Sequence, residues 1–336
     1  MTVNEKKVVL SGIRATGKLH LGNYFGALRY FVELSKDEDK ACYFFIANLH
    51  TLTTRTDPEE IQRDLLGVVR DFISVGIDPE KSVIFAQSSV PETSELNWLL
   101  ACLTSVFDLE RMPHFKEKKE DKEKQKEIIN AGLLTYPVLM AADILGPRAN
   151  LVPVGEDQHP HVELARDLAK RFNVLYGETF PIPSLLKGEA IRVLGLDGRK
   201  MGKSNENAID LSDDAETVRR KIRAAVTDPN RKRRKDPGTP EVCNIYAYHL
   251  LLSSNDEINA VVNGCRKAAI GCIECKEIIS MNISKLLLPI QDKQAEVIGK
   301  GERYIREVLH MGGKKARIRI AKTVDEVKGK MGVPFY

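Results

Sequence analysis

Residues 10–23 read LSGIRATGKLHLGN and predict the start of an α/β unit. Residues 7–10 (KVVL) predict a short buried strand, which runs into a turn marked by Gly12 and Gly17, and a helix is expected to open near Gly22. Glycines let backbone N–H groups approach a ligand closely, and the start of a helix carries positive partial charge. This geometry suits a nucleotide phosphate. Glycines at such a turn also occur for packing reasons alone, so the stretch leaves the function open.

Strand-like and helix-like patterns alternate after this turn. Residues 41–47 (ACYFFIA), 82–87 (SVIFAQ) and 150–154 have the composition of buried strands, and helical periodicity separates them. Helices are expected at residues 23–34, from the cap Asp57 to Gly76, at 91–107 and 131–145, and after Gln158, while the charged residues 116–127 are expected to form a mobile loop or a helix end. Such alternation predicts an α/β fold with a Rossmann-type doubly wound parallel sheet.

Helical periodicity replaces the strand pattern from about residue 211 onward. The segments that carry it are residues 215–225, 278–288, 294–309 and 316–331. A mostly helical C-terminal domain therefore follows the parallel sheet in this prediction.

Composition points to an ordinary globular protein. The chain has 336 residues, of which 43% are hydrophobic and 29% charged, which suffices for roughly two domains. No apolar run approaches the roughly 18–20 residues of a membrane span, and the first residues (MTVNEKKVVL) lack the apolar core of a signal peptide, so a cytoplasmic location is expected. In that compartment the six cysteines stay reduced, and Cys42 and Cys102 are expected to be core residues.

A second glycine-containing stretch, GRKMGKS, occupies residues 198–204. A Walker A loop needs four residues between its glycines, whereas three separate Gly198 from Gly202, so a P-loop NTPase is rejected. The remaining interpretation is a flexible loop that carries the two cations Lys200 and Lys203.

Read together, HLGN (residues 20–23) and KMGKS (200–204) resemble the two signature motifs of the class I aminoacyl-tRNA synthetases. GIRATGKLHLGNYFGAL, TYPVLMAADIL and LVPVGEDQHPHVELARDLAKRFN are similar to the tryptophanyl-tRNA synthetase family, and the resemblance covers nearly the whole chain in order. It implies a catalytic domain at 1–190 with an inserted dimer or connective segment at about 88–150. A KMGKS loop and linker follow at 191–210, and a helical anticodon-binding domain at 211–336, whose last helix could pack back on the core.

The activity that the resemblance implies is activation of L-tryptophan with ATP and Mg²⁺, followed by transfer to tRNA(Trp), in a homodimer. The implied ATP site comprises Arg14, Ala15, Thr16, Gly22, Asn23, Gly155, Glu156, Asp157, Val193, Lys200, Met201, Gly202, Lys203 and Ser204. The implied catalytic groups are His20 under the phosphates, Lys200 and Lys203 over them, and Lys118 reaching them.

This sequence departs from the usual family pattern at two positions. Gly202 stands where a serine is common and should loosen the loop, and Arg14 stands where many members carry glutamine. Arg14 is expected to contact either the tryptophan carboxylate or the ATP phosphates.

Asp143 is the residue whose chemistry bears most directly on the amino-acid substrate. It interrupts the apolar segment VLMAADIL, where burial of a carboxylate is costly without a donor, and an indole ring offers one N–H. A helix cap or an ion pair is the alternative role. Met140, Tyr136 and His50 are expected to line the same pocket, and Gln158 is expected either to bind the substrate amino group or to cap a helix.

Four cysteines downstream predict a metal site. Cys243, Cys265, Cys272 and Cys275 are separated by 22, 7 and 3 positions, and only the last two form a CxxC pair, unlike a zinc ribbon. The segment resembles the bacterial tryptophanyl-tRNA synthetases that carry a C-terminal [4Fe–4S] cluster. Zinc and free buried thiols are the alternatives.

A run of five cations, Arg231, Lys232, Arg233, Arg234 and Lys235, precedes these cysteines. It predicts a contact with the tRNA backbone, the alternative being a solvated loop.

Three other functions stay open at the level of sequence. A tyrosyl-tRNA synthetase would need polar groups that read a hydroxyl. A noncatalytic regulatory or tRNA-binding paralogue is favoured only by Gly202. An iron–sulfur redox protein finds no other support in the chain.

Overall fold

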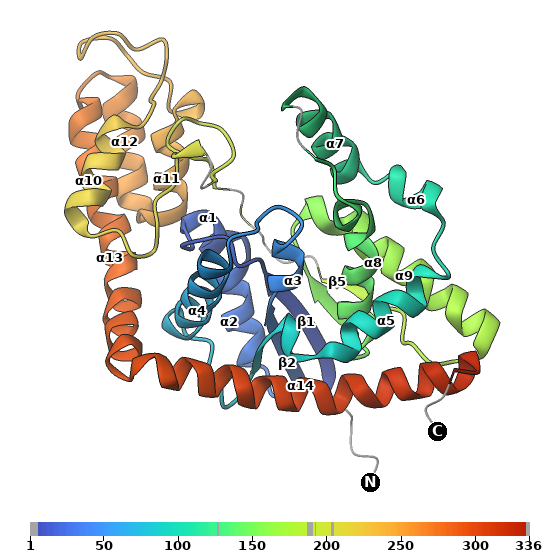
Figure 1. Cartoon of the computed structure of the whole chain (residues 1–336). Helices are drawn as coiled ribbons and strands as arrows, with labels where there is room; N and C mark the ends of the chain where they lie inside the picture. Colours follow the sequence, from blue (N-terminus) through green and yellow to red (C-terminus); the bar gives the residue numbers. More distant parts are fainter. Residues whose placement is uncertain (1–5, 126–127, 187–190, 192, 203–204, 334–336) are drawn as a thin grey trace. The chain divides into compact units, whose positions relative to one another are not determined.

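The computed structural model describes residues 6–125, 128–186, 191, 193–202 and 205–333. The chain forms two compact units, coloured by sequence in Figure 1. Unit 1 contains Met1–Gly17, Tyr30–Glu189 and Lys300–Tyr336, and unit 2 contains Lys18–Arg29 and Ala190–Gly299. The predicted catalytic, connective and anticodon-binding segments stay predictions.

Unit 1 is built on a parallel sheet. In the described part of the chain this sheet has five strands in the order β3-β2-β1-β4-β5, and every neighbouring pair is parallel. The strands are β1 (Lys7–Ile13), β2 (Lys40–Ile46), β3 (Val83–Ala86), β4 (Leu151–Pro153) and β5 (Ser184–Leu186). The predicted Rossmann-type doubly wound fold is confirmed.

The strand order fixes where a ligand crevice can form. The strands that follow β1, namely β2 and β3, lie to one side of β1 within the sheet. The chain then returns to β4, which pairs with the other side of β1, and continues outward to β5. The strand order therefore reverses between β1 and β4. In open parallel sheets, ligands bind beyond the carboxyl ends of the strands at such a switch point.

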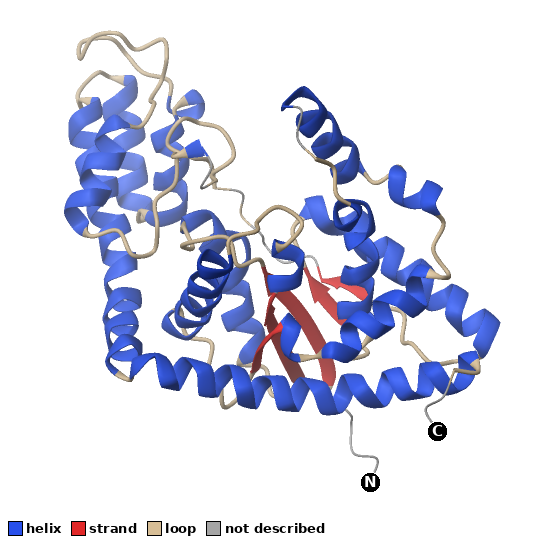
Figure 2. Cartoon of the chain, in the orientation of Figure 1, coloured by secondary structure: helices blue, strands red, loops and turns tan. Residues whose placement is uncertain are grey.

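Helices surround the sheet of unit 1 (Figure 2). They are α2 (Arg29–Ser35), α3 (Asn48–Thr51), α4 (Pro58–Ser74), η2 (Gln87–Ser89), α5 (Pro91–Ala101), α6 (Val106–Glu110), α7 (Pro113–Gln125), α8 (Ala131–Leu145), η3 (Glu156–Gln158), α9 (His159–Tyr176) and α14 (Gly301–Met331).

Helix α4 begins as the sequence predicts. The Asp57 side chain accepts hydrogen bonds from the N–H groups of Glu59 and Glu60, at 2.9 and 3.2 Å, and satisfies two donors of the first turn. The Glu60 carboxylate forms an ion pair with Arg55 at 2.8 Å instead of bonding back to the N–H of Asp57 as in a capping box.

Two helical segments differ from expectation. The helix expected at residues 91–107 is two helices, α5 and α6, and Trp98 on α5 is 70% exposed. The charged residues 116–125, expected as a loop or a helix end, lie within α7. Charged side chains are compatible with a solvated helix face, but they give no apolar periodicity by which a helix is recognised.

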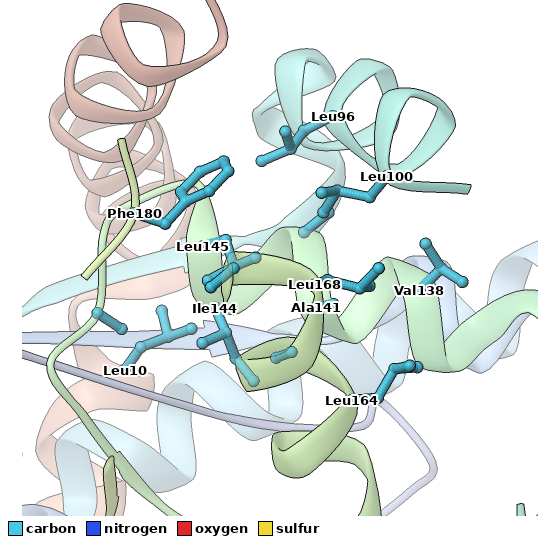
Figure 3. Packing of buried hydrophobic residues seen from close by; sticks show 14 of the residues in the cluster. Leu10, Leu96, Leu100, Val138, Ala141, Ile144, Leu145, Leu164, Leu168 and Phe180 are labelled. Atoms are coloured by element: carbon cyan, nitrogen blue, oxygen red, sulfur yellow. The ribbon is translucent and has the colours of Figure 1, made fainter. Parts of the chain in front are cut away.

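The core of unit 1 joins both sides of the switch point. Figure 3 shows Leu10 of β1 near Ile144 and Leu145 of α8, with Leu168 of α9 and Leu100 of α5 in the same cluster. Each fully buried leucine contributes about 1.5–3 kcal/mol relative to exposure. Packing thus fixes α8 against the strand ends.

Helix α14 closes unit 1 with unusually close backbone contact. It packs against β3, α4 and α5, and its buried residues Ala316, Ile320, Val324 and Val327 follow helical spacing. A Cβ atom at Gly312 would overlap the backbone carbonyl oxygen of Ile84 in β3. Only glycine therefore permits this approach.

Unit 2 is mostly helical. Its elements are α1 (Leu21–Asn23), η1 (Tyr24–Leu28), α10 (Ala215–Ala224), η5 (Pro240–Val242), α11 (Asn244–Leu252), α12 (Asn255–Arg266) and α13 (Cys272–Gly299). Helix α13 packs on α10 and α11. Helix α12 starts with a capping box, in which Ser254 and Glu257 each bond the other's backbone N–H.

Gly312→Ala is expected to destabilise unit 1 by about 1–3 kcal/mol, because the added methyl group must push α14 away from β3. Gly329→Ala is the matched control in the same helix, because a Cβ there meets nothing within 4 Å. It should stabilise the chain by up to about 1 kcal/mol. Thermal unfolding followed by circular dichroism measures both. An unfolding midpoint of Gly312→Ala at or above that of the wild type would contradict the close contact.

Candidate active site

A cavity of about 320 Å³ opens at the carboxyl ends of β1, β2 and β4 in unit 1. Its volume is within the range of small-molecule sites. The walls are largely apolar, with Leu10, Phe45, Leu133, Ile144 and Val152 among them. The five residues predicted to bind tryptophan, namely Asp143, Tyr136, Met140, His50 and Gln158, all line this cavity.

Helix α8 supplies three of these side chains. Tyr136, Met140 and Asp143 are spaced by four and three positions, which places them on one face of a helix. The Asn130 side chain caps the start of α8 by accepting the N–H of Leu133 at 2.9 Å. The face of α8 that borders the cavity is thus fixed by a cap at one end and core packing at the other.

Asp143 is the one acid among the described residues that line the cavity, and it is 6% exposed. His50 Nε2 lies 2.9 Å from its Oδ2, and Gln87 Nε2 lies 2.9 Å from both carboxylate oxygens. Burial raises the pKa of the Asp143 carboxyl above its usual range, and the hydrogen bonds from His50 and Gln87 oppose that rise. The carboxylate is therefore held by donors of the protein itself. Its contact with His50 is an ion pair when the imidazole is protonated, which matches the ion-pair alternative, whereas none of these contacts is a helix cap.

Gln87 is a site residue that the sequence reasoning missed. It directly follows β3 and is 1% exposed. A polar residue at the carboxyl end of a buried parallel strand was the available signal, because such ends border the crevice of this fold.

A second polar cluster borders Tyr136. Its hydroxyl lies 2.7 Å from Nε2 of His161 in α9, and the rings of His114 and His161 are 6.4 Å apart. Burial lowers the pKa of His161 to about 4, and the nearby His114 and His50 add to this effect. The Nε2 atom of a neutral His161 can accept a hydrogen bond from the Tyr136 hydroxyl, and this contact orients the phenol ring at the cavity wall.

The cations Arg14 and Lys118 are among the described residues that line the cavity. The Arg14 guanidinium donates to Thr54 Oγ1 at 2.5 Å, and Lys118 of α7 also lines the space. Burial lowers the pKa of Arg14, and the positive charge of Arg55 adds to this. An incompletely solvated guanidinium favours an anionic ligand beside it.

The remaining ATP-site residues predicted in unit 1 flank the strand ends. Ala15 is fully buried, and the Thr16 N–H donates to the Arg14 carbonyl at 3.0 Å. Gly155 precedes the single turn η3, where Glu156 and Asp157 are exposed. Gln158 Nε2 donates to Asp157 Oδ2 at 3.1 Å.

Unit 2 brings HLGN and the first part of KMGKS together. The Gly22 N–H donates to Met201 Sδ at 3.3 Å, and the Asn23 side chain accepts the His20 N–H at 3.1 Å. His20 and Met201 are buried, with exposed fractions of 7% and 5%. The two predicted signature motifs are therefore neighbours in space although 180 positions separate them in sequence, from residue 20 to residue 200.

The Asn207 side chain holds the loop around Gly202 at two points. Asn207 Oδ1 accepts the Gly202 N–H at 2.9 Å, and Asn207 Nδ2 donates to the Lys200 carbonyl at 3.2 Å. Val193, another predicted ATP-site residue, is buried. It directly precedes Leu194, which forms an isolated antiparallel bridge with Lys200. Lys203 and Ser204 lie outside the described residues.

Comparison with known proteins identifies the family. The family model described as tRNA synthetases class I (W and Y) matches residues 2–287. The Tryptophan--tRNA ligase of Thermotoga maritima is 45% identical over 332 residues, which cover 97% of this chain and 99% of that one. The chain belongs to the class I tRNA synthetases of the tryptophan and tyrosine family.

Further relatives of this class I chain are also named as enzymes for tryptophan. The Tryptophan--tRNA ligase of Deinococcus radiodurans is 42% identical, over 96% of this chain and 98% of that one. The crystal structure of tryptophanyl-tRNA synthetase from Campylobacter jejuni complexed with ADP and tryptophan has a TM-score of 0.85 at 35% identity, covering 97% of this chain and 99% of that one. The predicted enzyme class, a tryptophan–tRNA ligase, is confirmed.

The four cysteines of this class I synthetase lie in unit 2 but are not arranged as a finished metal site. Burial raises the pKa of Cys275 to about 12, and the thiols of Cys243, Cys265 and Cys272 each add to the rise. Nevertheless, a search of the described residues finds no group of three or more His, Cys, Asp or Glu side chains that could hold a metal ion. The four thiols are the ligand type that an iron–sulfur cluster needs, but their side chains do not form a metal-binding group among the described residues.

Of the other two cysteines expected in the core, Cys42 is buried and Cys102 is exposed. The expectation is wrong for Cys102 because it follows the end of α5, where the chain turns at the surface.

The basic run is partly engaged in contacts within unit 2. Arg231 donates to the Arg234 and Ile270 carbonyls at 2.9 and 2.8 Å, and Arg234 pairs with Glu274 at 3.0 Å. Lys232, Arg233 and Lys235 have exposed side chains.

Helices long and apolar enough to cross a membrane are not found among the described residues.

Proposed function

We propose that this chain activates L-tryptophan with ATP in the cavity of unit 1 and then transfers the tryptophanyl group to tRNA(Trp). The observation that carries the proposal is a buried carboxylate, Asp143, in an otherwise apolar wall. The relatives named tryptophan–tRNA ligases, and the Campylobacter jejuni structure that contains ADP and tryptophan, support it.

The chemistry of the pocket favours tryptophan over tyrosine. The indole ring has one N–H donor, and an ionised carboxylate is an acceptor only. A phenol hydroxyl both donates and accepts, so a tyrosine site needs a donor for its oxygen as well. The N–H groups of His50 and Gln87 that border Asp143 are already directed at the carboxylate.

Activation requires that charge be neutralised while two substrates are held in line. The tryptophan carboxylate oxygen forms a bond to the α-phosphorus of ATP, the bond from that phosphorus to the bridging oxygen breaks, and pyrophosphate leaves. ATP enters as its Mg²⁺ complex, which withdraws charge from the leaving group. Lys118 and Lys200 are proposed to neutralise phosphate charge, together with Lys203 outside the described residues, and His20 to donate a hydrogen bond.

Transfer is the second half of the reaction. A ribose hydroxyl at the 3′ end of the tRNA attacks the carbonyl carbon of the adenylate, and AMP leaves. Arg14 is proposed to face an anionic group of one of the small substrates, because its guanidinium borders the cavity.

Asp143→Asn and Asp143→Ala should each lower kcat/KM for tryptophan by at least about 100-fold, because the site loses the charged acceptor for the indole N–H. ATP–pyrophosphate exchange with tryptophan and with tyrosine measures this. Asp167→Ala, which removes an exposed acid on α9, is the control and should leave exchange unchanged.

Two results would reject the proposal. Near-normal tryptophan activation in the Asp143 variants would remove this carboxylate from the site. A wild-type chain that binds tRNA but catalyses no tryptophan-dependent exchange would instead be the noncatalytic paralogue.

We also propose that Cys243, Cys265, Cys272 and Cys275 bind a [4Fe–4S] cluster, with zinc as the alternative. Four thiols in one region of unit 2 are the ligand set that such clusters use. No step of the reaction is assigned to the cluster.

Protein purified without oxygen should be brown and contain about four irons per chain. Cys272→Ser with Cys275→Ser should remove the colour and the iron, whereas Cys102→Ser should keep both, because Cys102 belongs to unit 1. Colourless protein with stoichiometric zinc would establish the alternative metal, and metal-free protein would reject the site.

The basic run is proposed to contact the tRNA backbone through Lys232, Arg233 and Lys235, whose side chains are exposed. Arg231 and Arg234 hold the loop instead, through the carbonyl contacts and the Glu274 pair. These cations would position the RNA without reading its sequence.

Arg233→Glu with Lys235→Glu should weaken tRNA binding and reduce its salt dependence, because fewer counterions are released. Lys36→Glu with Lys81→Glu is the matched control of two exposed cations in unit 1. Binding titrations at several salt concentrations compare the two pairs. Equal affinities of both variants would exclude the basic run from the interface, and tryptophan activation should be normal in both.

A homodimer in the cytoplasm completes the proposal. Support comes from Trp98, Val106 and Phe107 on α5 and α6, which are 61–70% exposed within the predicted dimer segment. Light scattering that gives the mass of one chain would reject the dimer.

A further inference from the structure

A buried amide lies directly behind the acid of the proposed tryptophan site. Gln87 in η2 is 1% exposed, and among the described residues it is Asp143, and not Gln87, that lines the cavity. Gln87 Oε1 accepts the backbone N–H groups of Leu49 and His50, at 3.1 and 3.3 Å. Its Nε2 donates to both oxygens of Asp143 at 2.9 Å.

The backbone contacts fix which end of the amide faces the acid. Helix α3 starts after Ala47, whose side chain has no polar atom, so its second and third N–H groups need an acceptor from elsewhere. Those two groups belong to Leu49 and His50, and Gln87 Oε1 acts as their cap. A flipped amide would place its N–H₂ against these donors and its oxygen against the carboxylate. Only one orientation is therefore compatible with the surroundings, and it presents an N–H to Asp143.

The donors around Asp143 leave one acceptor position. Each carboxylate oxygen accepts about two hydrogen bonds. Within the described residues, Oδ2 is contacted by His50 Nε2 and Gln87 Nε2, whereas Oδ1 is contacted by Gln87 Nε2 alone. The remaining position on Oδ1 matches a ligand that has a single N–H.

Gln87 also ties together both partners of the His50–Asp143 contact. It accepts the backbone N–H of His50 and donates to the carboxylate that the His50 ring contacts. A shift of α3 relative to α8 would break several hydrogen bonds at once. The amide therefore acts as a spacer that sets the rotation of the Asp143 carboxylate.

We propose that Gln87 is the positioning residue for substrate specificity: it aims one oxygen of Asp143 at the indole N–H of tryptophan without contacting the substrate. This inference rests on the proposed function, because it assumes that Asp143 reads the indole. It extends that function by assigning the discrimination to a residue outside the pocket wall.

The test compares tryptophan with β-(3-benzothienyl)alanine, in which sulfur replaces the indole N–H. Gln87→Glu keeps an oxygen for the α3 cap and replaces the donor with a second carboxyl group, which competes with Asp143 for a proton. Gln87→Met keeps the approximate size and removes both functions. In ATP–pyrophosphate exchange, each variant should reduce the ratio of kcat/KM for tryptophan to that for the analogue by about 10-fold or more.

Asn173→Asp is the matched control. Asn173 is also an amide of unit 1 whose oxygen accepts two backbone N–H groups, those of Thr179 and Phe180, both at 3.0 Å. It lies at the end of α9 and is not among the described residues that line the cavity. This variant should keep the wild-type ratio, whatever its effect on stability.

The ratio separates positioning from a merely structural role. If the Gln87 variants remain folded and lose activity equally with both substrates, or keep the wild-type ratio, the inference is wrong. If the wild-type chain itself does not prefer tryptophan over the analogue, the role of Asp143 in the proposed function fails, and the inference fails with it. Thermal unfolding of Gln87→Glu and Gln87→Met confirms that the rates refer to folded protein.

Discussion

The site of this protein depends on one constraint, which is that a carboxylate buried in an apolar wall must be surrounded by donors. Asp143 meets it through His50 of α3 and Gln87 of η2, so three elements from different parts of the chain converge on two oxygen atoms. The apolar packing of α8 places the acid there, and the polar contacts decide how it is turned. Specificity in such a pocket arises from the acceptor position on Asp143 Oδ1 that no donor among the described residues occupies.

The fold could be predicted because its periodic patterns are local. The apolar run 41–47 became β2 with a one-residue shift, and Asp57 and Pro58 marked the start of α4 correctly. Where the pattern lacked apolar residues, prediction failed. All ten of residues 116–125 are polar and nine are charged, so their helix has no apolar stripe by which to be recognised.

The site was predictable only in part, for a related reason. Asp143 is conspicuous because it interrupts an apolar helix, and the lining residues on α8 follow from helical spacing. For Gln87 the signal is weaker, because its position after β3 indicates the edge of the crevice but not the partners of its amide. Its role depends on partners 38 and 56 positions away, Leu49 and Asp143, that only the folded chain brings within reach. The interaction of Arg14 with Thr54 was invisible for the same reason.

Unit 1 is discontinuous in sequence, and the helix of its last segment, α14, packs directly against the backbone of β3. The strands β1 to β5 leave the ribosome before residues 187–300, and α14 follows only after them. During synthesis the edge strand β3 therefore stays uncovered by α14 while the segment Ala190–Gly299 of unit 2 is made. Until α14 is made, the edge strand β3 exposes unpaired backbone N–H and C=O groups that can pair with strands of other chains. A chaperone that covers this edge during translation would prevent such aggregation.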